Sequence, residues 1–145
     1  MKKRLLFCSF VGILTACQRE GDIQPTSTTL TGEVVGTYRT NFYIDPSVAL
    51  SAGQLPYAEV KAESDNKVTL VFHQPALAQK DRVVQHVSLS RRANSIQFNV
   101  SSSTIATLQA DRVFSDNGME KEGQLLRITL QDGSESTLNF SGARQ

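Results

Sequence analysis

From residue 57 onward, apolar side chains recur at every second position in short runs that are separated by turn residues. A period of two places alternate side chains on opposite faces of a β-strand, so each run predicts a strand with one buried face. Pairs such as Asp132-Gly133 between the runs are typical of tight hairpins. The predicted strands cover about 57–63, 67–73, 82–90, 95–100, 104–111, 123–131 and 134–140.

A further strand is predicted before these, over residues 33–44, where Tyr38 and Phe42 lie on the same apolar side. Residues 45–53 begin with Asp-Pro and end with Gly, a pattern that is typical of a short helix. No later segment has a helical period. About eight antiparallel strands with one short helix after the first predict an all-β fold, either a small closed barrel or a β-sandwich.

The amino terminus has the pattern of a secretory signal, because residues 1–4 are basic after Met and residues 5–14 are apolar. A run of about ten apolar residues is too short to cross a bilayer. The sequence Leu14-Thr15-Ala16-Cys17 that follows resembles the lipobox of bacterial lipoproteins. Cleavage by the ordinary signal peptidase is less favoured, because it needs small residues at −1 and −3 and Leu14 would stand at −3.

The lipobox resemblance implies a diacylglycerol on Cys17, removal of residues 1–16 and a further acyl chain, such as palmitate, on the new amino terminus. Residues 17–30 are polar without a periodic apolar face, which predicts a flexible tether, although part of it could form a first edge strand. Residues 31–145 form the predicted barrel domain. The expected location is the cell envelope. The outer membrane is favoured, facing the periplasm or the surface, because Gln18 is not the Asp associated with inner-membrane retention.

Gly36-Thr37-Tyr38 opens the first predicted strand, and a short helix and seven further strands follow it. This arrangement resembles the small lipocalin-like lipoproteins of bacteria, whose usual opening is G-x-W. Tyr38 takes the place of the Trp in a chain that has no Trp. The resemblance implies a barrel that binds a small, mostly apolar ligand.

Several side chains share the inward side of their predicted strands, and small alanines beside them would leave space for a ligand. An eight-stranded barrel can hold one small ligand or be filled by its own side chains, so a filled core remains the alternative. The candidates to line a ligand site are Tyr38, Phe42, Phe72, Gln85, Phe98 and Phe140.

Motifs for catalysis, cofactors or metals are not recognised in the sequence. It has no G-x-S-x-G, no phosphate-binding glycine loop and no H-E-x-x-H. Its two histidines, His73 and His86, are expected at the surface about 13 Å apart, too far to share a metal ion. Lys and Arg total 15 against 14 Asp and Glu, which argues against a nucleic-acid partner. We therefore expect no enzyme, no cofactor and no metal.

Two functions remain. The first is a lipid-anchored barrel that captures a small apolar molecule, which an enclosed cavity above about 300 Å³ would favour. The second is a filled barrel that docks an envelope partner as an assembly accessory, an adhesion component or an enzyme inhibitor. One apolar patch on the outer face would favour the second function. The outward apolar residues are Val35, Tyr43, Val71, Val84 and Leu125.

Overall fold

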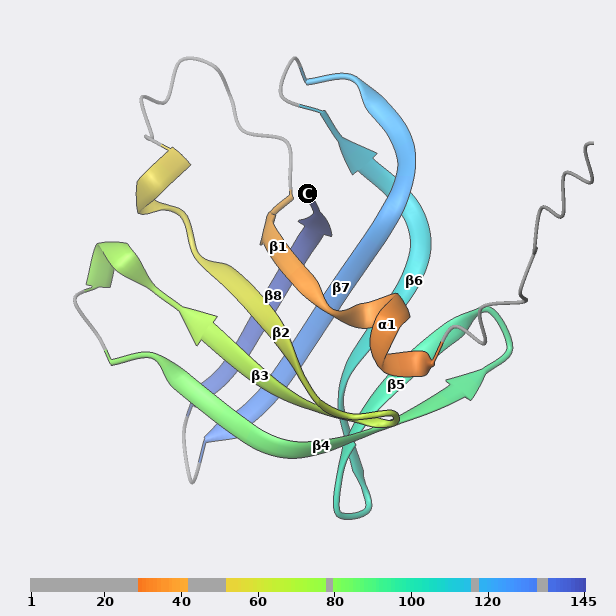
Figure 1. Cartoon of the computed structure of the whole chain (residues 1–145). Coiled ribbons are helices and arrows are strands. Elements are labelled where there is room, and N and C mark those ends of the chain that lie inside the picture. The colour runs from red at the N-terminus through yellow and green to blue at the C-terminus, as the bar shows by residue number, and fades with distance from the viewer. Residues whose placement is uncertain (1–28, 42–51, 78–79, 116–117, 133–135) are drawn as a thin grey trace, which may run out of the picture.

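The structure is a computed structural model that describes residues 29–41, 52–77, 80–115, 118–132 and 136–145. Eight antiparallel strands form a closed barrel in which each strand pairs with its neighbours in chain order and β8 pairs with β1 (Figure 1). The all-β barrel prediction is confirmed, and closure excludes the sandwich. The strands are β1 (Gly36–Thr40), β2 (Tyr57–Ser64), β3 (Lys67–His73), β4 (Arg82–Arg92), β5 (Ser95–Val100), β6 (Ser103–Phe114), β7 (Glu120–Asp132) and β8 (Ser136–Arg144).

The seven predicted runs after residue 56 each correspond to one strand, β2 to β8. The alternation has the expected cause, since inward side chains such as Leu70, Phe98 and Leu126 are fully buried. Outward neighbours on these strands, such as Thr69 and Arg127, are half-buried or exposed. Burial of one face of every strand therefore builds a single core inside the barrel.

The first strand is shorter than predicted. The structure places residues 33 and 34 in a five-residue helix, α1 (Leu30–Val34), and β1 begins only at Gly36. Thr29 caps this helix, because its side chain accepts a hydrogen bond from the Gly32 backbone N–H at 3.2 Å. The prediction of a strand from residue 33 is wrong here, since local capping and packing against the barrel end outweigh the alternating pattern.

The predicted helix over 45–53 is described only at its end, where the 3₁₀ turn η1 (Ala52–Gln54) follows β1. Its other residues lie outside the described part of the chain. A second 3₁₀ turn, η2 (Pro75–Leu77), lies between β3 and β4 and contacts η1. Both turns belong to connections at the barrel end opposite α1.

Helix α1 closes the other end of the barrel, at the front of the view in Figure 1. The Thr31 hydroxyl donates to the Ser64 carbonyl oxygen at 2.6 Å, and the Tyr38 hydroxyl donates to the Val34 carbonyl oxygen at 2.7 Å. The Arg144 guanidinium donates to two backbone carbonyl oxygens at the end of the helix, at 2.7 and 2.5 Å. Val34 is fully buried. The helix is therefore a fixed plug rather than part of a tether.

The pairing of β3 with β4 contains a register shift. Val84 and Val87 both pack toward the core although they are three residues apart. The two residues between them, Gln85 and His86, are exposed, and His86 adopts a positive φ of 58°. An extra residue in one strand of a pair is a β-bulge, and it reverses the side-chain alternation beyond it.

The long β6–β7 hairpin curls until its end lies near the end of β1 (Figure 1). The Asn41 side chain joins the two, because its amide donates to the Phe114 carbonyl oxygen at 2.8 Å and accepts from the Phe114 N–H at 2.9 Å. Val113 and Leu125, on the outward side of this hairpin, are almost fully buried. Both residues are buried without being part of the barrel's core cluster.

Candidate functional site

The barrel interior contains four of the six predicted ligand-lining residues. Tyr38 and Phe98 are fully buried, and Phe72 and Phe140 keep only 3% and 7% of their surface exposed. The rings of Phe72 and Phe140 touch edge to face, with centroids 5.2 Å apart. These two side chains occupy the space between β3 and β8. The fifth residue, Phe42, lies outside the described residues.

Tyr38 already has a partner for its polar group. Its hydroxyl donates to the Val34 carbonyl oxygen, so the phenol is satisfied by α1. Burial raises the pKa of Tyr38 to about 12, although the nearby Arg144 charge lowers it slightly. The buried tyrosine therefore stays neutral at any physiological pH and acts as a structural hydrogen-bond donor.

The prediction for Gln85 is wrong. Its side chain is exposed, because the bulge in β4 turns Gln85 outward. Val84 takes the inward position instead and packs against the core. No polar side chain from β4 between residues 84 and 87 therefore enters the interior.

The predicted apolar patch on the outer face does not form among the described residues. Val71 and Leu125 are 7% and 6% exposed, Val84 faces the core, and Val35 is half-buried. Tyr43 lies outside the described residues. The bulge removes Val84 from this face. Leu125 belongs to the curled β6–β7 hairpin and is buried there. Val83, 54% exposed, is the apolar side chain that the bulge leaves outward instead.

A ring of half-buried apolar side chains surrounds the core at the barrel end opposite α1. Its members lie near the ends of five successive strands, and all pack against the core. We call this ring the apolar rim. It consists of Val84, Val100, Ile105, Leu130 and Leu138.

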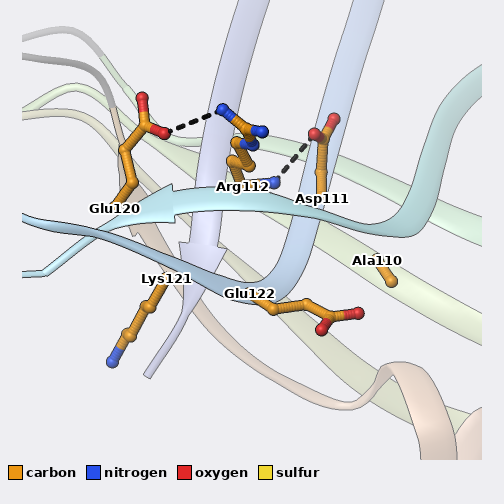
Figure 2. Close-up of a pocket in the computed structure, with 6 residues that line it drawn as sticks. All are labelled: Ala110, Asp111, Arg112, Glu120, Lys121 and Glu122. Carbon is orange, nitrogen blue, oxygen red and sulfur yellow. Dashed lines mark hydrogen bonds and ion pairs between the residues drawn. The ribbon is translucent and has the colours of Figure 1, made fainter.

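Two open hollows lie outside the core. One, of about 490 Å³, lies on the β6–β7 hairpin, where Arg112 pairs with Glu120 at 3.2 Å (Figure 2). The other, of about 560 Å³, lies beside α1 and includes Arg144. Of the predicted ligand-lining residues that the structure describes, none lines either hollow. Two of the small alanines, Ala62 and Ala110, line these hollows, whereas Ala58 and Ala106 are buried in the core.

A cluster of interacting side chains surrounds His73 on the outer face of the barrel. Nδ1 of His73 lies 2.8 Å from Oδ1 of Asp81, and Nε2 lies 3.8 Å from Oε2 of Glu59. Tyr57 stacks on the imidazole, with ring centroids 4.2 Å apart. Only 16% of the His73 side chain is exposed, so the expectation of a surface histidine is wrong in this respect. We call Tyr57, Glu59, His73 and Asp81 the His73 cluster.

The electrostatics of this cluster favour an ionised Glu59. The hydrogen bond from Lys61, 2.9 Å away, holds the pKa of the Glu59 carboxyl below its usual value, and the Lys61 and His73 charges add to this effect while burial opposes it. Nε2 of His73 is buried and has no hydrogen-bond partner among the residues that the structure describes, because its 3.8 Å separation from Glu59 exceeds hydrogen-bond distance. A buried nitrogen without a partner is uncommon in folded proteins.

His86 contrasts with His73. Its side chain is 78% exposed, as predicted, and Nδ1 lies 3.0 Å from Oε2 of Glu63. Glu63 also accepts from the Thr69 hydroxyl and the His86 N–H, and these hydrogen bonds hold its pKa below the usual value. The two histidines therefore have separate carboxylate partners. Within the described ranges, no three His, Cys, Asp or Glu side chains are grouped to hold a metal ion.

Sequence reasoning did not connect His73 with its neighbours, although a signal was present. The hairpin of β2 and β3 places Tyr57 opposite His73, and Glu59 follows on the same outward side. Asp81, just before β4, required the tertiary structure, because the connection from β3 does not have a regular turn length.

Comparison with known proteins finds no matching family model and no significantly similar characterised protein or solved structure. In the described part of the chain, no helix is long and apolar enough to cross a membrane.

Proposed function

We propose that this protein is a lipid-anchored protein of the bacterial cell envelope that acts, without catalysis, by binding another envelope component at the outside of its barrel. The observation that carries this proposal is the occupied interior. Phe72 and Phe140 meet inside the barrel, and the Tyr38 hydroxyl is already bound by α1. Such a core makes the barrel a rigid support for surface residues.

The lipobox at Cys17 supports the anchor, and the fold is compatible with it. Helix α1 begins at Leu30, so the closed end of the barrel is the end nearest the anchor. A flexible tether of about a dozen residues has a reach of roughly 20 Å. The apolar rim lies at the opposite end of the barrel.

The anchor is tested by metabolic labelling with a palmitate analogue. We expect the label on the wild-type chain and its loss in Cys17→Ser. The matched control is Cys8→Ser, which changes the chain's other cysteine within the predicted signal and should leave labelling intact. Labelling that persists in Cys17→Ser would refute the anchor at this residue.

The filled core is tested by Phe72→Ala together with an environment-sensitive apolar dye. In a filled core this substitution leaves a cavity and should lower the free energy of unfolding by about 3–5 kcal/mol. Gln85→Ala, on an exposed side chain of the bulge, is the control and should change it little. Binding of the dye by the wild-type chain, with only a small loss of stability in Phe72→Ala, would contradict the filled core.

A second candidate function is binding of a small, mostly apolar ligand at the apolar rim, as the lipocalin resemblance implies. The observation that favours it is the partial exposure of five apolar side chains around one end of the core. If the ligand sits there, Leu138→Gln should abolish dye binding while the chain remains folded. Equal dye binding by the wild type and Leu138→Gln would exclude this candidate.

A further inference from the structure

The His73 cluster joins three strands at the barrel end opposite α1. Tyr57 and Glu59 belong to β2, His73 ends β3, and Asp81 immediately precedes β4. From this geometry we infer that the cluster is a proton-operated clasp, in which protonation of Nε2 of His73 ties the start of β4 to β2 and β3. This inference is independent of the proposed function, because it concerns how the barrel end responds to pH.

The case for a bound proton comes from the hydrogen-bonding capacity of imidazole. A neutral ring carries one N–H, and a protonated ring carries two. Nδ1 of His73 is 2.8 Å from Asp81, which places an N–H on that nitrogen. In the neutral ring, Nε2 would then present a lone pair toward the Glu59 carboxylate, two acceptors facing each other. A proton taken up from solvent at Nε2 turns this contact into an attractive ion pair between the imidazolium and the Glu59 carboxylate.

The groups around the ring favour the same state. Glu59 and Asp81 supply two carboxylates that flank His73 on its two nitrogens. A cation in contact with these groups is that of Lys61 on β2, which pairs with Oε2 of Glu59 at 2.9 Å, while Arg82 follows Asp81 in the chain at the start of β4. Tyr57 covers one face of the ring and separates it from water. The lowered pKa of Glu59 keeps its carboxylate charged well into the acidic range.

The sign of the pH dependence follows from the form of the ring that carries a second N–H. Only the protonated imidazole has an N–H on Nε2 as well as on Nδ1, so only this form is linked to both the Asp81 and the Glu59 carboxylates. A link that requires a bound proton stabilises the folded chain at lower pH and is lost as the pH rises.

The clasp lies beside the apolar rim. Arg82 pairs with Phe72, and Val84, two residues further along β4, belongs to the rim. Loss of the proton would thus loosen the part of β4 that closes this barrel end.

The test compares melting temperatures of the purified chain at about pH 5.5 and pH 8. We expect the wild-type melting temperature to fall by roughly 5 °C more than that of His73→Gln over this interval. Asp81→Asn keeps an acceptor for Nδ1 but removes the charge, so it should reduce the pH-dependent fall as well. The matched control is His86→Gln, which removes the exposed histidine and should retain the wild-type fall.

A local measurement keeps the test decisive if His73→Gln does not fold. Amide exchange protection of Val83 should fall from pH 5.5 to pH 8 in the wild-type chain, whereas that of Leu126 in the barrel core should stay constant. Glu59→Gln should remove the change at Val83. The clasp would be overturned if the melting temperature of His73→Gln fell between pH 5.5 and pH 8 by as much as that of the wild type. Equal changes in amide exchange protection at Val83 and Leu126 would overturn it as well.

Discussion

Ionising Tyr38 would place a negative charge inside the closed end of the barrel, so alkaline pH should unfold this protein in a defined window. Burial raises the pKa of Tyr38 from 10.0 to about 12. Between these values the unfolded chain has released the phenolic proton while the folded chain retains it. The folded state then binds more protons, and the free energy of unfolding falls as the pH rises.

The size of this effect follows from the shift. Each pKa unit corresponds to about 1.36 kcal/mol, so a shift of about two units contributes about 2.7 kcal/mol. This contribution is present in full below about pH 10 and is lost as the pH approaches 12. It is a large part of the roughly 5–15 kcal/mol that stabilises a typical domain.

Denaturant unfolding of wild type and Tyr38→Phe at about pH 8, 10 and 11.5 isolates this group. The variant should be less stable at pH 8 by about 1–3 kcal/mol, because the Val34 carbonyl oxygen loses its hydrogen bond. Its stability should then fall less steeply with pH than that of the wild type, because the variant lacks the Tyr38 phenol. Lysines and other groups titrate equally in both chains. An identical fall in the two chains would refute the assignment of a buried, neutral Tyr38.

Other substitutions test the packing and the corrected face of β4. Gly142→Ala should lower the free energy of unfolding by about 1–3 kcal/mol, because the new Cβ would lie 2.5 Å from a core aromatic ring, whereas Gly53→Ala meets no atom within 4 Å and should be tolerated. Asn41→Ala removes two hydrogen bonds to the Phe114 backbone, so hydrogen exchange at the end of β6 should become faster. Gln85→Lys should leave the melting temperature unchanged, and a large loss would show that Gln85 faces the core after all.

Much of the fold could be predicted because burial imposes a period of two. The strand predicted over 95–100 matches β5, and 67–73 matches β3, since both have one continuous inward face. The inward burial of Tyr38, Phe72 and Phe98 follows from the same alternation. Such assignments depend only on each residue and its near neighbours, and a single sequence contains that information.

The candidate site depended on contacts that the pattern does not encode. The bulge at Gln85 and His86 shifts the register between β3 and β4, and this one extra residue turns Gln85 outward and Val84 inward. The burial of Leu125 accompanies the curl of a hairpin whose end meets Asn41 from the other end of the chain.

By itself, the sequence determined an all-β chain of about eight strands, the positions of most of those strands along the chain and most of the side chains in its core. Alternation and turn chemistry act over a few residues, so they can be recognised without coordinates. Only the tertiary structure decided that residues 30–34 form a plug and that Asp81 reaches His73. The plug depends on barrel closure, because closure brings Arg144 beside α1, and such long-range hydrogen bonds and packing outweigh local preferences.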